Sequence, residues 1–240
     1  MSIRTEWVKL AVADGTSMRA YVARPEGKAS AALVVMQEAF GVNPHIRDVT
    51  ERFAREGYLA IAPELFHRTG EGVECGYTDF GSVMPHFQAL TNEGQEADIR
   101  AAYDWVVNGS GETGLAVAAI GYCMGGRAAF LANLALPLAC AVSYYGGGIA
   151  PSPYFPALLG REAELHGPMM LVWGGLDQGI ALDKTRAIED ALVAAKKPYV
   201  NITFSYADHG FFCDARAQYN ATAAAEAWPL TLAFLKTHTA

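Results

Sequence analysis

The sequence has little charge and no long hydrophobic run. Charged residues make up 18% of the 240 positions, hydrophobic residues make up 52%, and the formal net charge is −7. No segment approaches the roughly 20 consecutive apolar residues that a membrane-spanning helix needs. No cluster of Lys and Arg offers the basic face that binding to phosphate groups requires. The composition therefore predicts a globular chain with a large core, and it argues against membrane and nucleic-acid partners.

Cysteine is also scarce. The chain has four cysteines, Cys75, Cys123, Cys140 and Cys213. They are too few and too scattered for a disulfide scaffold, and no CxxC or HxxxH spacing indicates a structural metal. The first residues, Met1–Trp7, lack a charged segment followed by an apolar one, so no signal peptide is expected. A reducing, cytoplasmic setting is the prediction.

Apolar runs alternate with helical patterns along the whole chain. Strands are expected over 5–11, 18–23, 31–36, 58–62, 115–121, 139–145, 169–173 and 199–206. Helices are expected after Asn43, before the strand at 115, over 127–134, after a cap at Asp183, and near the end of the chain. The stretch 66–92 has no clear period. This alternation predicts one α/β domain over 1–240, with a doubly wound, mainly parallel sheet and helices on both faces.

The strongest motif is Gly121-Tyr122-Cys123-Met124-Gly125-Gly126, between a predicted buried strand and a predicted helix. Its spacing matches the Gly-x-nucleophile-x-Gly elbow of the α/β-hydrolase fold, in which the nucleophile sits on a strained turn and its neighbours must lack side chains. A helix N-terminus behind the turn favours a thiolate and a developing oxyanion. Cys123 is thus the candidate nucleophile; the alternative is an ordinary buried cysteine.

A thiol nucleophile needs a base. Three histidines follow Cys123, and His209 is the preferred candidate because it lies in a loop directly after the last predicted strand. His166 precedes a strand instead. His238 lies close to the end of the chain, where disorder is expected. The alternative for His209 is a structural loop histidine.

The base needs a carboxylate to orient it, and in this fold the acid lies between nucleophile and histidine in the chain. Asp177 follows a predicted buried strand and two glycines, so it is the preferred acid. Asp183 is better explained as a helix cap and Asp208 as a solvated neighbour of His209. Glu38 follows another buried strand, in the loop expected to supply an oxyanion donor; it is equally well explained as a solvated loop acid.

Three aromatic residues near strand ends are candidates for the pocket wall. They are Phe40, Tyr145 and Phe211. Their alternative role is ordinary aromatic core, which fits the pattern equally well.

Four segments together resemble the dienelactone hydrolase family. They are Gln37–Gly41, the Gly121–Gly126 elbow, Gly175–Asp177 and Asp208–Phe211, in family order over nearly the whole chain. The resemblance implies the α/β-hydrolase fold without a large cap domain, and a triad of Cys123, His209 and Asp177. It also implies an oxyanion hole from the backbone N–H groups of Met124 and Ala39, with Glu38 helping to take the thiol proton. No metal or organic cofactor is implied.

Family members open small cyclic enol-lactones, such as dienelactone, to dicarboxylates such as maleylacetate. An arginine four residues after the histidine contacts the substrate carboxylate in the best-known members, whereas this sequence has Cys213 there. Arg216 and Arg68 are the two candidates to replace it. The resemblance implies a small-molecule lactone or ester substrate. The alternatives are an esterase or acyltransferase acting on an unrelated substrate, and a non-catalytic protein that senses or binds through its thiol.

Overall fold

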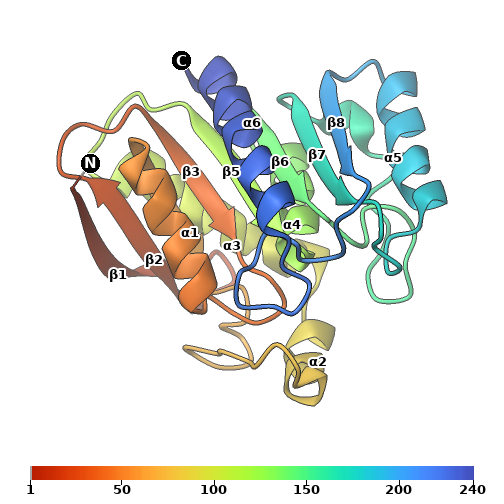
Figure 1. Ribbon diagram of the computed structural model, residues 1–240. Coiled ribbons are helices and arrows are strands. Elements are labelled where there is room, and N and C mark those ends of the chain that lie inside the picture. The colour runs from red at the N-terminus through yellow and green to blue at the C-terminus, as the bar shows by residue number, and fades with distance from the viewer. Residues whose placement is uncertain (1) are drawn as a thin grey trace.

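The computed structural model describes residues 2–240, and its strands form one eight-stranded sheet (Figure 1). The strands are β1 (Ile3–Ala11), β2 (Ser17–Pro25), β3 (Ala31–Met36), β4 (Tyr58–Pro63), β5 (Val117–Tyr122), β6 (Ala141–Tyr144), β7 (Met169–Gly174) and β8 (Tyr199–Phe204). Their order across the sheet is β1-β2-β4-β3-β5-β6-β7-β8. Strand β2 pairs antiparallel with both β1 and β4, and every other pair of neighbouring strands is parallel. The predicted mainly parallel sheet of the α/β-hydrolase fold is therefore confirmed.

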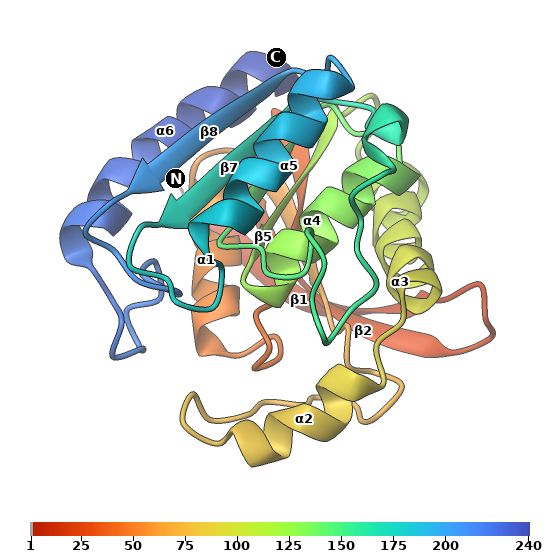
Figure 2. The same cartoon turned by 90° about the vertical axis from the view of Figure 1, so that its right-hand side faces the viewer.

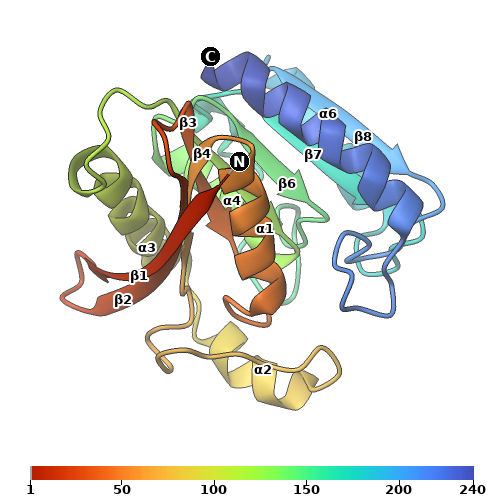
Figure 3. The ribbon, with the colours of Figure 1, turned by 60° about the vertical axis from the view of Figure 1, so that its left-hand side comes forward.

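Helices cover both faces of this sheet. They are α1 (Pro44–Arg55), α2 (Phe80–Gln88), α3 (Asn92–Asp104), α4 (Met124–Ala135), α5 (Leu182–Ala194) and α6 (Ala221–Thr239). A short π-helix follows α3 at Trp105–Gly109, and a 3₁₀ turn covers Glu162–Glu164. Figure 3 shows α1 and α6 together on one face, and Figure 2 shows α3, α4 and α5 on the other. Among residues 2–240, no helix has both the length and the apolar character that crossing a membrane requires.

Local chemistry explains where the helices begin. The Asn43 side chain accepts a hydrogen bond from Ile46 N at 3.2 Å, and Pro44 occupies the first turn of α1, as predicted. The prediction that Asp183 caps α5 is wrong, because the cap position is Ala181 and Asp183 lies inside the first turn. His238, expected to be disordered, lies in the last turn of α6 with its ring 4.6 Å from that of Phe234.

The helix α2 was not predicted from the sequence. It contains Pro85 and buries only Val83, so it shows no apolar stripe. Figures 1 and 2 show it standing apart, beyond the edge at which the parallel strands end. The segment leading to it packs on the loop after β3. A Cβ at Gly41 would overlap the carbonyl oxygen of Val73, and Cys75 N donates to Phe40 O at 3.2 Å.

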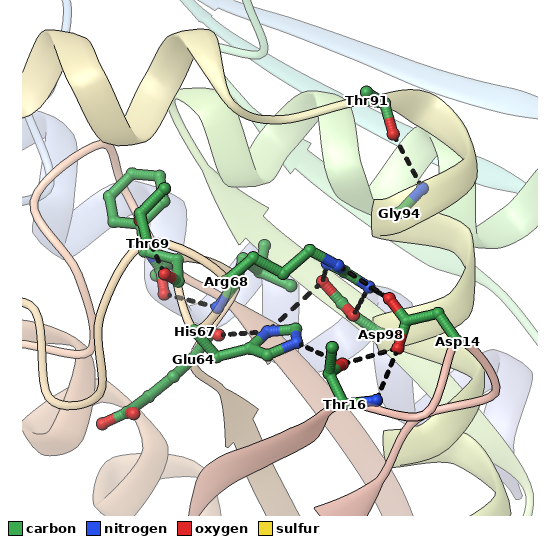
Figure 4. A network of polar contacts seen from close by, with 12 residues as sticks. Asp14, Thr16, Glu64, His67, Arg68, Thr69, Thr91, Gly94 and Asp98 are labelled. Carbon is green, nitrogen blue, oxygen red and sulfur yellow. Dashed lines mark hydrogen bonds and ion pairs between the residues drawn. The ribbon is translucent and has the colours of Figure 1, made fainter.

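A polar network anchors the start of this segment (Figure 4). The Arg68 guanidinium donates two hydrogen bonds of 2.8 Å to Asp98 on α3, and its other contacts reach Asp14 in the β1–β2 turn. His67 Nε2 lies 2.9 Å from the hydroxyl of Thr16 in the same turn. The network thus joins the hairpin, the segment after β4 and α3.

Asp98 is the buried member of this network. Its side chain is fully buried, and burial raises its pKa to about 6 despite the opposing effect of Arg68. Because this folded-state pKa exceeds the model value of 3.8, Asp98 lowers folding stability as the pH rises from that value to about 6, and the loss is complete above pH 6. Arg68 limits that loss by pairing with the ionised carboxylate.

We predict that Arg68→Met lowers the free energy of unfolding by about 3 kcal/mol at pH 7, because it leaves a buried carboxylate without its partner. At pH 5 the loss should be clearly smaller, since Asp98 is then protonated in the folded state. Urea denaturation at both pH values measures this. The control Arg55→Met removes an exposed pair with Glu51 and should cost less than about 1 kcal/mol at either pH. A loss for Arg68→Met that does not change with pH would contradict the explanation.

Candidate active site

Cys123 lies on the tight turn between β5 and α4. Its backbone has φ 56° and ψ −119°, a conformation that non-glycine residues rarely adopt. Its N–H donates to Tyr144 O at 3.0 Å, which ties the turn to β6. A Cβ at Gly121 would overlap the carbonyl of Gly125, and a Cβ at Gly125 would overlap the carbonyl of Met36. Both glycines are therefore required by the close approach of strand and helix.

His209 and Asp177 meet beside this turn, from the loops after β8 and β7. His209 Nδ1 lies 2.7 Å from Asp177 Oδ2. The other oxygen, Asp177 Oδ1, accepts hydrogen bonds from the backbone N–H groups of Gly179 at 2.8 Å and Ile180 at 3.0 Å. With Nδ1 on the carboxylate, Nε2 is the ring nitrogen left for the sulfur of Cys123. The loop geometry thus brings together all three residues that the sequence nominated.

The charges of this cluster support one another. Burial acts to lower the pKa of His209, but the sulfur of Cys123 and the carboxylate of Asp177 outweigh it and raise the pKa to about 10. Burial acts to raise the pKa of Asp177, yet the hydrogen bond and charge of His209, with the two backbone N–H groups, hold it below its usual value. The two partners of the ring therefore favour the protonated form of His209.

Glu38 occupies the loop after β3 and is fully buried. Its Oε1 accepts a hydrogen bond from Arg216 Nη1 at 3.1 Å, while its Oε2 has no hydrogen-bond partner among residues 2–240. The pKa of Arg216 is raised: burial acts to lower it, and the charges of Glu38 and Cys123 prevail. A buried carboxylate oxygen without a donor is costly, which marks this group as more than a solvated loop acid.

The two candidate arginines have different places. Arg216 lies beside Glu38, with its guanidinium carbon 5.5 Å from the centre of the Phe40 ring. Arg68 belongs to the separate network with Asp98 that is shown in Figure 4. Of the two, only Arg216 stands next to the elbow.

The two backbone positions nominated as oxyanion donors lie on either side of the same contact. Met124 is the first residue of α4, where N–H groups have no acceptor within the helix. Ala39 follows Glu38 in the loop whose carbonyls, at Met36 and Gln37, pack against Gly125. Ala39 also forms a small apolar cluster with Phe40 and Val83 of α2.

A cavity of about 250 Å³ opens over Cys123, Met124 and His209. Its far walls come from the loop after β6, the first turns of α5 and the end of α2. The other side chains and glycines that line it are Phe87, Gly146, Gly147, Gly148, Ala150, Ser152, Pro153, Tyr154, Phe155, Gly179, Ile180, Lys184 and Ile188.

The aromatic side chains nominated from the sequence do not line this cavity. Phe40, Tyr145 and Phe211 are at most 1% exposed and belong to the core. Tyr145 supports the site from below, with its ring 5.1 Å from that of His209. The cavity is instead lined by Phe87, Tyr154 and Phe155, and the ring of Phe87 contacts each of the other two. These three lie on an unpredicted helix and in a loop, where no periodic pattern pointed to them.

Arg127 is a buried residue of the site that sequence reasoning missed. It lies in the first turn of α4 and donates to Gly148 O at 3.0 Å and to Pro156 O at 2.9 Å. Its guanidinium carbon lies 4.6 Å from the centre of the Phe155 ring. Burial without a carboxylate lowers the pKa of Arg127 to about 10. It fixes the loop that forms one cavity wall, and its position directly after Gly125-Gly126 was the available signal.

Glu38, His45 and Cys213 form the one group of possible metal ligands found among residues 2–240. Their nearest ligand atoms lie within 4.8 Å of one another. A thiol must lose its proton to bind a metal, but burial raises the pKa of Cys213 to about 11. Glu38 is already paired with Arg216, and the Cys213 sulfur lies 3.3 Å from the Tyr77 hydroxyl. The cluster therefore fits a supporting layer behind the elbow better than a metal centre.

Comparisons with known proteins agree on one family. The sequence model of the dienelactone hydrolase family matches residues 18–239. A relative from Synechocystis sp. named "Putative carboxymethylenebutenolidase" is 37% identical over 203 residues, 82% of this chain and 81% of the relative. A relative of the same name from Escherichia coli (strain K12) is 33% identical over 233 residues, 93% of this chain and 83% of the relative.

Solved structures of dienelactone hydrolases and similar proteins superpose on this chain over nearly its whole length. The crystal structure of a "Putative Dienelactone Hydrolase" from Klebsiella pneumoniae superposes with a TM-score of 0.86 at 30% identity, over 97% of this chain and 98% of that one. A dienelactone hydrolase-like protein from metagenomic libraries, P91, superposes with a TM-score of 0.81 over 98% and 99% of the two chains. Its identity of 21% supports the fold alone.

The link between Cys123 and His209 can be tested by titration. We predict that Cys123→Ala lowers the pKa of His209, because the sulfur is the largest influence that raises it. NMR of the imidazole resonances from pH 5 to 11 measures the shift, and Cys75→Ala, which leaves the elbow intact, serves as control. An unchanged His209 titration in Cys123→Ala would show that the sulfur and the ring do not interact.

Proposed function

This chain belongs to the dienelactone hydrolase family and is a carboxylic ester hydrolase; on that premise we propose that it acts through a Cys123–His209–Asp177 triad. One observation carries the proposal: a cysteine on a strained elbow faces the same cavity as a histidine that is held by a buried carboxylate. The three roles of nucleophile, base and orienting acid then fall to residues whose positions suit them.

The first half of the cycle forms a thioester. The Cys123 sulfur attacks the carbonyl carbon of a lactone or activated ester, and its proton passes to Glu38 or His209. The N–H groups of Met124 and Ala39 stabilise the oxyanion, an effect of about 3 kcal/mol per donor in comparable enzymes. The tetrahedral intermediate collapses, the carbon–oxygen bond to the leaving group breaks, and the leaving oxygen takes up the proton that the thiol gave to Glu38 or His209.

The second half hydrolyses the thioester. Neutral His209, held by Asp177, takes a proton from water, and the resulting hydroxide adds to the thioester carbonyl. The carbon–sulfur bond then breaks, the carboxylic acid is released, and the sulfur of Cys123 takes back a proton from His209. Because a stable enolate leaves more readily than an alkoxide, an enol-lactone suits this site better than a simple alkyl ester. Dienelactone, opened to maleylacetate, is the substrate we propose first, in line with the name that the relatives carry.

The first experiment assays the protein on cis- and trans-dienelactone beside p-nitrophenyl acetate. We predict that Cys123→Ala lowers kcat by at least about 10³-fold on every substrate that the native protein turns over. Cys75→Ala, which removes another partly exposed thiol, should retain activity. Turnover of the ester without the lactone would keep the triad and assign an unrelated ester substrate. Equal activity in Cys123→Ala would overturn the cysteine mechanism. Replacement of His209 or Asp177 should also abolish turnover, because a protein that only senses through its thiol would not need either residue.

Glu38 has its own test. We predict that Glu38→Gln slows formation of the thioester by about 10²-fold while leaving its hydrolysis within about threefold, because only the first half requires a second proton acceptor. Rapid-mixing measurements of the p-nitrophenolate burst separate the two steps. The melting temperature must be recorded beside them, since the substitution leaves Arg216 without its carboxylate. Equal slowing of both steps would assign Glu38 a structural role.

A further inference from the structure

The cavity over Cys123 has an uneven distribution of charge. Its walls are largely apolar, with three aromatic side chains and two isoleucines, and they contain no Asp or Glu. Lys184 is the only Lys or Arg in the lining. The remaining basic side chain, His209, is engaged with Asp177. One ammonium group is therefore the only free charge that this cavity offers to a ligand.

Nothing in the fold accounts for the position of Lys184. It lies in the first turn of α5, where the helix dipole disfavours a cation. The side chain is partly buried, and across residues 2–240 its ammonium makes no ion pair or hydrogen bond within the usual distance limits. It shares the cavity-facing side of α5 with Ile188, one turn further along, and Ile180 lies just before the helix.

We propose that Lys184 binds a carboxylate of the substrate, while Phe87, Tyr154 and Phe155 contact its apolar body. This inference rests on the proposed hydrolysis at Cys123 and assigns the residue that would select substrates by their charge.

The charge count favours a monoanion. A second carboxylate would enter an apolar cavity without a partner, which costs several kcal/mol. A phosphate group would need more donors than one ammonium supplies, and no arginine fork lines the cavity. Arg216 lies outside this lining and is paired with Glu38, so the cation that a ligand in the cavity meets is Lys184.

The test compares two p-nitrophenyl esters of equal chain length, the monoester of glutarate and the neutral valerate. The native protein should show the lower KM for the glutarate monoester. We predict that Lys184→Met raises that KM by about 10- to 100-fold, the effect expected for a partly desolvated charged hydrogen bond. Its kcat, and both constants for the valerate, should stay within about threefold. Lys184→Arg should restore most of the preference.

The matched control is Arg186→Met, which removes a cation from the same helix at an exposed position outside the cavity. It should leave the KM of both esters unchanged. An equal rise in KM for both esters in Lys184→Met, or the same loss in Arg186→Met, would overturn the proposal. An equal rise for both esters would indicate that the substitution distorts the cavity. The same loss in Arg186→Met would indicate that any positive charge on α5 has this effect.

Binding measurements separate this inference from the proposed chemistry. With Cys123→Ala, calorimetry can follow cinnamate, cinnamamide and phthalate, which are a monoanion, a neutral analogue and a dianion. Cinnamate should bind most tightly, and adding Lys184→Met should remove its advantage over cinnamamide. Retention of that advantage would refute the role of Lys184 even where hydrolysis at Cys123 is demonstrated. Its loss would support the role even where neither ester is cleaved.

Discussion

The close contact between β5 and α4 is the constraint on which the rest of the site depends. Without side chains at Gly121 and Gly125, the helix starts directly against the strand and against the carbonyls that follow β3. Cys123 then has a positive φ, which costs on the order of 1–3 kcal/mol and persists only because the surrounding packing fixes it. In return the sulfur stands clear of the sheet, at the start of a helix whose free N–H groups face the same space.

The order of the strands turns this local constraint into a complete site. Strands β3, β5, β6, β7 and β8 are consecutive in the sheet and run parallel, so their carboxyl ends form one edge. Open α/β sheets bind ligands at this edge. Glu38, Cys123, Asp177 and His209 each follow a different strand of this set. Residues separated by more than 170 positions, such as Glu38 and Arg216, meet there without any dedicated binding domain.

The site thus consists of residues that directly follow strands and of walls formed by loops and α2, and these two parts differ in how well the sequence predicts them. Buried parallel strands produce continuous apolar runs, so β3, β5 and β7 and the residues that follow them were readily located. The cavity walls could not be, because they depend on contacts between loops and on α2, which shows no periodic pattern. The buried rings of Phe40, Tyr145 and Phe211 illustrate the limit. Proximity to a strand end does not determine whether a side chain points into the cavity or below it.

The positions of the cations suggest how the site keeps catalysis and recognition apart. Arg216 is partly buried and paired with Glu38, and Arg127 is buried where it joins one wall of the cavity to α4. Both arginines already bind protein oxygens, and neither lines the cavity. The ammonium group of Lys184, by contrast, makes no ion pair or hydrogen bond with residues 2–240. A carboxylate drawn to Lys184 would orient the substrate from the side of α5 and leave the Glu38–Arg216 pair undisturbed for proton transfer. Recognition of the substrate's charge and activation of the nucleophile would then depend on different residues, so that substrate preference can change without loss of the activating groups.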